Sequence, residues 1–255
     1  MGAEKRILSY IRRAAEDYGM ICRDDRIAVG VSGGKDSLAL LWAMAQLRRF
    51  WPQPFELGAI TVDMGFEGAD YGPLQAFCDQ LDVPLTVVPT QIAQVVFDIR
   101  KEKNPCSLCA KLRRGSLHST AAAQGYNKVA LGHHLDDVAE TMLMNLFHEG
   151  RIGSFAPVTF LDRSGITLIR PMIYLPEKQI SYFARHTRLP VTESLCPANR
   201  NTQRQVAKDL IASLDRQNSG TAYRIFGALQ RGEISGYRPA SALLHYEKAD
   251  KEAEE

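Results

Sequence analysis

A run of six small and charged residues carries the first candidate chemistry of this chain. The run consists of Ser32, Gly33, Gly34, Lys35, Asp36 and Ser37. It follows a predicted strand at 26–31 and precedes a predicted helix in which apolar residues recur at helical spacing from Leu38. Ser and Gly let successive backbone N–H groups converge on an anion, and the helix adds the positive end of its dipole. We therefore predict a phosphate-binding loop rather than an ordinary turn.

A second polar stretch lies at another predicted junction between a strand and a helix. It contains Gly132, His133, His134, Asp136, Asp137, Glu140 and Thr141. One interpretation is a metal site, although adjacent side chains point in different directions and only one of each pair could readily reach a given ion. The second is a helix cap at Asp136 or Asp137, with the histidines filling the junction. The third is an acidic site for the Mg²⁺ that accompanies ATP phosphates, because Mg²⁺ prefers carboxylate oxygens.

Three cysteines form the third candidate group. Cys106 and Cys109 make a Cys-x-x-Cys pair, and Cys196 lies farther along in a proline-flanked loop. Zinc prefers four ligands and an iron–sulfur cluster needs at least three cysteines, so zinc, a cluster and a redox dithiol all stay open from the residues. Cys22 and Cys78 lie in amphipathic segments, where we expect small core or surface residues.

Cationic side chains crowd the Cys-x-x-Cys segment. They are Lys101, Lys103, Lys111, Arg113 and Arg114. Such a cluster suits an RNA backbone that approaches the cysteines, and the alternative is a patch that only keeps the surface solvated. The formal net charge of +2 is mild, so nucleic-acid binding is argued from this clustering alone.

Strands and helices alternate along the chain in the lengths typical of parallel βαβ units. We predict strands at 26–31, 55–62, 85–88 and 128–131, and helices at 73–81, 112–124 and 136–147. This pattern predicts an α/β fold with an open, doubly wound parallel sheet, whose ligands bind beyond the carboxyl ends of the strands. Three candidate sites fall at such ends: 32–37, Asp63 and 132–137.

The remaining elements flank this core. Residues 5–18 predict an amphipathic helix that packs on the main domain. Residues 166–169 predict a strand that forms a hairpin with 158–161, and helices follow at 177–187 and 203–214. We expect Val206, Leu210 and Ile211 to share one face of the last helix.

The composition indicates an ordinary globular protein. Its 255 residues suit one large domain with appendages, and 45% hydrophobic and 24% charged residues are typical values. No apolar run approaches the roughly 18 to 20 residues that span a bilayer, and the charged amino terminus lacks the apolar region of a signal peptide. We therefore expect a cytoplasmic protein without membrane association, in which five cysteines favour metal binding or catalysis over disulfides.

The loop at 32–37 resembles the pyrophosphate loop, S-G-G-x-D-S, of the PP-loop ATP-pyrophosphatase (adenine nucleotide α-hydrolase-like) superfamily. That resemblance implies cleavage of ATP to AMP and pyrophosphate. The stretch at 132–141 resembles the G-H-[HN]-x-D-D-x-x-E-T motif of tRNA-modifying members, which favours nucleotide, Mg²⁺ and catalysis among the interpretations above.

The motifs together resemble the tRNA 2-thiocytidine synthetases. The matching segments, in the order of that family, are 32–37, 105–115, 132–141, Arg170-Pro171, and Cys196 followed by Gln203-Arg204-Gln205. The resemblance covers roughly Lys5 to Leu214. It implies an N-terminal helix at 1–22, a PP-loop domain at 23–215 with the Cys-x-x-Cys segment inserted, and a partly disordered C-terminal extension at 216–255. One departure is Glu193, which stands where many members have a fourth cysteine.

The resemblance also implies a mechanism. The C2 oxygen of a cytidine in a tRNA anticodon loop attacks the α-phosphorus of ATP, and a sulfur nucleophile carried on the open iron of a 4Fe–4S cluster then displaces AMP. The implied ATP-binding residues are the loop at 32–37, Asp63, Gly132 and His133. The implied catalytic residues are Lys35, Asp36, Asp136 and Asp137. Cys106, Cys109 and Cys196 would hold the cluster, with zinc as the alternative. Lys111, Arg113, Arg114 and Arg204 would bind the RNA.

Partners and rival functions follow from the same resemblance. The partners would be tRNA and a sulfur donor such as a cysteine desulfurase or inorganic sulfide, while the oligomeric state stays open, with a homodimer as one alternative. A cysteine persulfide without a cluster is the rival within this chemistry. Other rivals are thiolation of uridine or of a small molecule, a tRNA lysidine synthetase, which has no need of three cysteines, and a non-catalytic nucleotide or iron–sulfur sensor.

Overall fold

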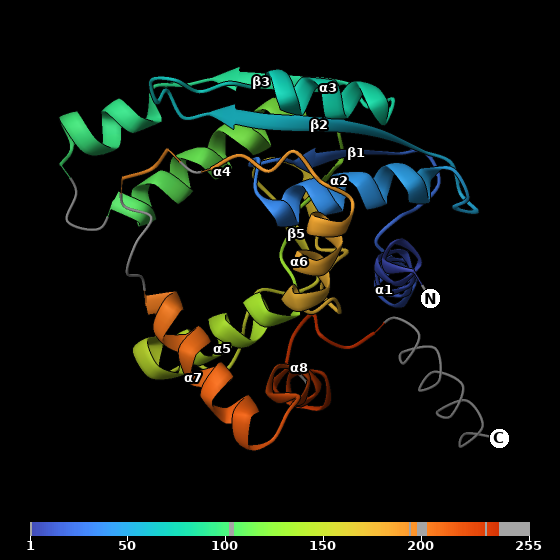
Figure 1. The fold of residues 1–255 in the computed structure, drawn as a ribbon, viewed down its shortest axis with the longest axis vertical. Coiled ribbons are helices and arrows are strands. Elements are labelled where there is room, and N and C mark those ends of the chain that lie inside the picture. Colours follow the sequence, from blue (N-terminus) through green and yellow to red (C-terminus); the bar gives the residue numbers. More distant parts are fainter. Residues whose placement is uncertain (1, 102–104, 194, 198–202, 233, 240–255) are drawn as a thin grey trace.

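A parallel-dominated sheet forms the centre of the molecule (Figure 1). The computed structural model describes residues 2–101, 105–193, 195–197, 203–232 and 234–239. Among these residues, six strands form one sheet in the order β3-β2-β1-β4-β6-β5. The strands are β1 (Asp25–Gly30), β2 (Phe55–Asp63), β3 (Leu85–Pro89), β4 (Lys128–Ala130), β5 (Val158–Leu161) and β6 (Ile166–Ile169). All neighbours are parallel except β5 and β6, which form the predicted hairpin at one edge.

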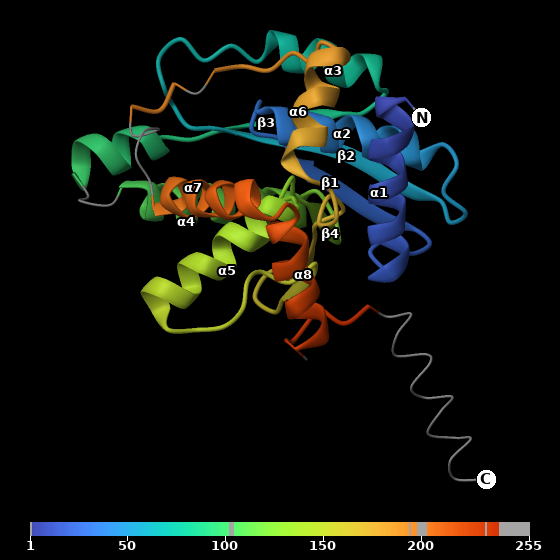
Figure 2. The ribbon, with the colours of Figure 1, turned by 60° about the horizontal axis from the view of Figure 1, so that its bottom comes forward.

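Helices cover both faces of this sheet and extend below it (Figures 1 and 2). They are α1 (Ala3–Asp17), α2 (Lys35–Arg48), α3 (Gly72–Gln80), α4 (Pro105–Ala123), α5 (Leu135–Glu149), α6 (Glu177–His186), α7 (Gln203–Gln217) and α8 (Thr221–Arg231), with a π-helical turn at Gln94–Ile99. α4 packs against one face of the sheet, and α1, α2 and α6 pack together on the other. α7 and α8 both pack against α5, as Figure 2 shows.

Alternating side chains of β1 bury both faces of the sheet. Ile27 and Val29 belong to the large core under α1, α2 and α6. Ala28 faces a smaller core with Leu117 and Ala121 of α4. Successive residues of a strand point to opposite faces, so a central parallel strand must be apolar on both. The predicted α/β doubly wound fold is confirmed.

The strand order places β1 between β2 and β4, which are both parallel to it. The chain moves from β1 outward through β2 to β3, and later returns to the other side of β1 as β4. This reversal is the point at which open α/β sheets bind ligands, at the carboxyl ends of the strands. The segments 31–37 after β1 and 131–134 after β4 meet there.

Several elements differ from the sequence-based expectation. α4 begins at Pro105 rather than near Leu112, so the Cys-x-x-Cys pair forms its first turn. Proline suits the first turn of a helix because its missing N–H is not needed there. On α7, Ile211 is buried, whereas Val206 and Leu210 are exposed, so the predicted apolar face is only partly covered by the rest of the protein. α8 and the π-helical turn were not predicted.

Two expectations lie outside the residues that the structure describes: the part of the C-terminal extension beyond residue 239, where we expected disorder, and the contribution of Lys103 to the cationic cluster. The domain boundaries at 22/23 and 215/216 stay a prediction. No helix within the described ranges combines the length and the apolar character needed to cross a membrane.

Candidate active site

The phosphate loop, residues 32–37, is an internally hydrogen-bonded turn between β1 and α2. The Ser37 hydroxyl accepts from the Ser32 backbone N–H at 3.1 Å and donates to the Gly34 carbonyl at 3.0 Å. The Ser32 and Ser37 hydroxyl oxygens lie 3.2 Å apart. α2 begins at Lys35, so the unpaired N–H groups of its first turn lie at the loop. The side chains thus hold the shape of the turn, and backbone N–H groups are left for an anion.

Two glycines let neighbouring segments approach this loop closely. Gly33 has a positive φ of 81°, and its carbonyl accepts a hydrogen bond from the Thr192 N–H at 3.1 Å. A Cβ atom at Gly132 would lie 3.1 Å from both the carbonyl carbon of Asp36 and the backbone nitrogen of Ser37. The segment after β4 therefore packs directly on the backbone of the phosphate loop, which brings the first two predicted stretches into one site.

Lys35 and Asp36 form an ion pair in the first turn of α2, with 3.0 Å between Lys35 Nζ and Asp36 Oδ2. The other oxygen, Asp36 Oδ1, is buried without a hydrogen-bond partner among the described residues. It lies 3.9 Å from His134 Nε2. A buried unpartnered carboxylate oxygen is costly unless a cation or a donor completes it, so Asp36 has one oxygen available for a ligand.

The two histidines of the second stretch have different structural roles. His134 caps α5: its Nδ1 accepts from the Asp137 N–H at 3.4 Å, and Asp137 Oδ2 accepts from the His134 N–H at 3.0 Å. His133 packs against Phe155 with 4.8 Å between ring centroids, and burial lowers its pKa to about 4. The helix-cap interpretation is therefore confirmed in part, with His134 rather than an aspartate as the cap residue.

Asp136 links the site to α6. Its Oδ2 accepts a hydrogen bond from the Glu177 N–H at 2.7 Å, at the first residue of α6. Glu177 in turn contacts two lysines, with 3.0 Å from Oε1 to Lys35 Nζ and 2.6 Å from Oε2 to Lys208 Nζ. Glu177 and Lys208 were not predicted as site residues, because they lie in segments without a recognisable motif.

Arg204 of α7 binds the carboxylates on the outer side of α5. Its guanidinium lies 2.7 Å from Asp137 Oδ1 and 3.3 Å from Glu140 Oε2. Burial, followed by the charge of Asp137, raises the pKa of Glu140 to about 7, while Arg204 opposes that rise. Arg204 thus has internal partners, and contact with RNA stays a prediction for this residue.

Asp63 ends β2, next to the phosphate loop in the sheet. Its Oδ1 accepts from the Gly65 N–H at 2.9 Å, which shapes the turn after the strand. Burial and a hydrogen bond to Asp63 raise the pKa of Tyr71 to about 12. A role of Asp63 in ATP binding agrees with this position at the carboxyl edge of the sheet and stays a prediction.

The three predicted cysteines lie in one region on two separate segments. Cys106 is exposed, while Cys109 and Cys196 are partly buried. Burial raises the pKa of Cys109, Arg113 lowers it, and the charges of Cys196 and Cys106 raise it further, so both other thiols lie near Cys109. Among the described residues, no three metal-binding side chains converge on a single ion. Cys196 follows Thr192, whose backbone binds the phosphate loop, by four residues.

The cationic cluster lies on the surface beside these cysteines. Lys101, Lys111, Arg113 and Arg114 are all exposed. Arg114 Nε donates to the carbonyl of Ala110 at 3.2 Å, which aligns this side chain along α4. The cluster is therefore accessible to a large polyanion, and binding of RNA to it stays a prediction.

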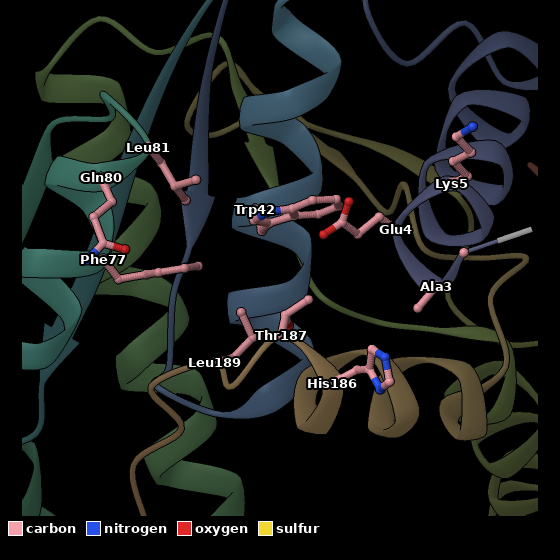
Figure 3. A pocket seen from close by; sticks show the side chains of 11 residues that line it. Ala3, Glu4, Lys5, Trp42, Phe77, Gln80, Leu81, His186, Thr187 and Leu189 are labelled. Atoms are coloured by element: carbon pink, nitrogen blue, oxygen red, sulfur yellow. The ribbon is translucent and has the colours of Figure 1, made fainter.

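A separate surface pocket of about 930 Å³ lies between α1, α2, α3 and the end of α6 (Figure 3). Trp42 of α2 projects into its middle, with Phe77 and Leu81 on one side and Glu4 on the other. None of the predicted site residues lines this pocket. The candidate active site is instead the open edge of the sheet around the phosphate loop.

Comparisons with known proteins agree with this geometry. The PP-loop domain family matches residues 4–211. The tRNA-cytidine(32) 2-sulfurtransferase of Teredinibacter turnerae is 39% identical over 230 residues, which are 89% of this chain and 76% of that protein. The enzyme of the same name from Geobacter sulfurreducens is 39% identical over 88% of this chain and 89% of its own. The U34-tRNA thiolase NcsA from Methanococcus maripaludis, solved with its 4Fe–4S cluster, superimposes with a TM-score of 0.74 at 25% identity over 91% of this chain and 80% of that one.

Proposed function

This chain belongs to the tRNA 2-thiocytidine synthetase family of the PP-loop superfamily, and from that premise we propose that it replaces the C2 oxygen of a cytidine in the tRNA anticodon loop by sulfur. It is an ATP-dependent tRNA-thiolating enzyme. One observation carries the assignment to these residues: the segment that bears Cys196 is hydrogen-bonded through Thr192 to Gly33 of the phosphate loop. Activation and sulfur delivery would therefore take place at adjoining sites.

The phosphate loop would hold the β and γ phosphates of ATP through its backbone N–H groups. Lys35 would then stabilise the charge that grows on pyrophosphate as the cytidine C2 oxygen attacks the α-phosphorus. This step forms the C2–O–P linkage and releases pyrophosphate. It converts a carbonyl oxygen that leaves poorly into one that leaves with AMP when sulfur takes its place at C2.

Mg²⁺ fits the carboxylates of the site. Asp36 Oδ1 is buried and unpartnered, whereas both Asp136 and Asp137 are engaged in hydrogen bonds at helix starts. Mg²⁺ is held by one or two carboxylates together with substrate phosphates. Asp36 would therefore bind the metal, and Asp136 and Asp137 would position α6 and α5 around it.

The cysteines fit a 4Fe–4S cluster better than a single metal ion. Cys106 and Cys196 both lie near Cys109, yet no three metal-binding side chains of the described residues converge on one ion, whereas the irons of a cluster bind separate thiolates. Burial raises the pKa of Cys109, and Arg113 opposes that rise. When bound by three cysteines, such a cluster supplies one iron without a protein thiolate, at which sulfur can be delivered. Zinc would need a fourth ligand, such as His or water, beyond the three thiolates.

The partners follow from this chemistry. The exposed cations of α4 would bind the tRNA backbone next to the cysteines. A cysteine desulfurase or inorganic sulfide would supply the sulfur, and the cytoplasm is where a tRNA substrate is available. A homodimer is compatible with the proposal, which requires only one chain per site.

The decisive experiment measures pyrophosphate release from ATP with and without tRNA, together with mass spectrometry of the tRNA nucleosides. We expect release that depends on tRNA and the appearance of 2-thiocytidine when a sulfur source is present. Lys35→Ala should reduce both by at least about 100-fold, because the charge on the leaving pyrophosphate is no longer offset.

A tRNA with uridine in place of the target cytidine is the matched substrate control. If pyrophosphate release does not require tRNA, or if Lys35→Ala matches the wild type, the proposed mechanism is wrong. Formation of a thiolated uridine instead would assign the enzyme to the other thiolases of the superfamily.

A further inference from the structure

Four charged side chains from three helices form a continuous chain of ion pairs at the phosphate loop. Asp36 and Lys35 belong to α2, Glu177 to α6 and Lys208 to α7. The distances along the chain are 3.0 Å from Asp36 to Lys35, 3.0 Å from Lys35 to Glu177 and 2.6 Å from Glu177 to Lys208. The helices are thus connected through the lysine that we assign to the leaving pyrophosphate.

Lys35 has a defined orientation because two carboxylates hold it. An ammonium group has three N–H donors, and the contacts with Asp36 and Glu177 use two of them. The third donor is left for a phosphate oxygen. A free lysine side chain would have to lose rotamer freedom when ATP reacts, whereas this one is already ordered.

Glu177 is itself fixed at both ends. Its backbone N–H donates to Asp136 at the start of α6, and Lys208 binds the carboxylate oxygen that Lys35 does not use. Burial raises the pKa of Glu177, but the hydrogen bonds and charges of Lys208 and Lys35 outweigh this effect and lower the pKa to about 2. The carboxylate is therefore ionised whenever the enzyme is folded near neutral pH.

We propose that Glu177 is a positioning residue of the phosphate site, which holds Lys35 in the orientation needed for pyrophosphate release, and that Lys208 supports Glu177 from α7. The proposal rests on the assigned role of Lys35 in the proposed function. Neither residue needs to touch ATP for this role. The positioning role predicts that loss of Glu177 lowers the rate of the chemical step rather than the affinity for ATP, because a misplaced cation chiefly affects the charge that develops in the transition state.

The test compares Glu177→Gln with Glu4→Gln, which removes the same kind of charge from the first turn of α1. In tRNA-dependent pyrophosphate release, Glu177→Gln should lower kcat by about 10- to 100-fold with less than about a threefold change in the KM for ATP. Glu4→Gln should match the wild type. Lys208→Met should lower kcat in the same direction, Lys208→Arg should restore most of it, and Lys178→Met on the exposed side of α6 should have no effect.

A second measurement reads the orientation of Lys35 without catalysis. Asp36 and Glu177 each hold Lys35 Nζ at 3.0 Å. Replacing the Glu177 carboxylate by a neutral amide weakens one of these two contacts and leaves the amine less restrained, so an amine-acylating reagent, mapped by mass spectrometry, should modify Lys35 several-fold faster in Glu177→Gln. Tryptophan fluorescence melting would show whether each variant is folded.

The outcomes separate this proposal from the proposed function. A wild type without tRNA-dependent pyrophosphate release would refute the proposed function, whereas the labelling comparison would still test the Lys35–Glu177 contact. If the wild type is active but Glu177→Gln raises KM with kcat unchanged, or labels Lys35 at the wild-type rate, the positioning role is refuted. If Glu177→Gln does not fold, the contrast between Lys208→Met and Lys208→Arg decides, and equal activity of the two would overturn the proposal.

Discussion

Two glutamates contact the same face of α7, yet their surroundings move their pKa values in opposite directions. Glu140 is 3% exposed and lies beside Asp137, and burial with that charge raises its pKa to about 7. Glu177 lies between Lys35 and Lys208, which lower its pKa to about 2 against the effect of burial. The residue type alone therefore did not decide the charge state; the balance of desolvation and neighbouring cations did.

These shifts predict opposite effects of pH on folding stability. The pKa of Glu177 lies below the unfolded value of 4.5, so its contribution is lost as pH falls from about 4.5 toward 2. The pKa of Glu140 lies above 4.5, so the folded state holds the extra proton, and stability is lost as pH rises from about 4.5 to 7. The free energy of unfolding in urea should be compared for Glu140→Gln and wild type at about pH 5 and about pH 8. Relative to wild type, the variant should become more stable by on the order of 1 kcal/mol at the higher pH, because it lacks the group whose ionisation destabilises the folded state.

Glu149, an exposed residue at the end of α5, the helix that also carries Glu140, provides the control. The free energy of unfolding of Glu149→Gln should change between the two pH values by the same amount as that of the wild type. A stability difference between Glu140→Gln and wild type that stays constant across this range would contradict the raised pKa.

At the scale of elements, the site depends on how closely the segment after β4 approaches the start of α2. Gly132 has backbone atoms of Asp36 and Ser37 within 3.1 Å of the position of a Cβ atom. Backbone cannot rotate away as a side chain can, so one segment must move if a methyl group is added. The displaced segment would be the phosphate loop, because β4 is held between β1 and β6.

Gly132→Ala should therefore weaken ATP binding by about 10-fold, since small displacements of a binding loop are costly. Isothermal titration calorimetry with ATP and Mg²⁺ would measure this, and circular dichroism would show that the fold is retained. Gly115→Ala is the matched control: α4 leaves nothing within 4 Å of the new methyl group. That variant should bind ATP normally and gain roughly 0.5 to 1 kcal/mol of stability from the better helix former. ATP binding by Gly132→Ala that equals the control would show that the loop accommodates the methyl group.

Elements with a local apolar pattern could be predicted from the sequence, whereas elements whose position depends on tertiary packing could not. Ile27, Val29 and Ile60 lie in short apolar runs bounded by turn residues, and such local patterns identify buried strands without tertiary information. α4 was placed too late because residues 105–111 begin with a proline and carry a single large apolar side chain, Leu108, and because the start of the helix depends on packing beside the π-helical turn. The exposure of Val206 on α7 could not be predicted, because the buried face of that helix is set by α5 and α8.

The site was predictable to the extent that it lies in contiguous motifs. The phosphate loop and Asp137 occur in runs whose spacing itself indicates strand, turn and helix. Glu177 and Lys208 each appear in the sequence as one charge among many. Only the packing of α6 and α7 brings them to Lys35, which lies 142 residues or more away along the chain. Charge pairs of this kind require the tertiary structure.

At the scale of the whole molecule, the two candidate chemistries lie on different parts of the fold. The phosphate loop directly follows the central strand β1, which is buried on both sides. The cysteines lie on the first turn of α4 and on the segment after α6. The hydrogen bond from Thr192 to Gly33 connects the two parts. Under the proposed function, activation of the substrate would proceed without the cysteines, while sulfur transfer would require both parts.

This division predicts that variants of the two parts lose different properties. Cys106→Ser, prepared without oxygen, should lose a visible-range absorption band and all thiolation, yet still release about one pyrophosphate per tRNA, because the adenylated tRNA accumulates when no sulfur is delivered to displace AMP. Lys35→Ala should keep the band and lose both pyrophosphate release and thiolation. Cys22→Ser, which changes an exposed cysteine of no proposed role, should match the wild type in all three measurements. Loss of the initial pyrophosphate release in Cys106→Ser, with Cys22→Ser unaffected, would mean that the cysteine segment also shapes the ATP site, and the two parts would then act as a single unit.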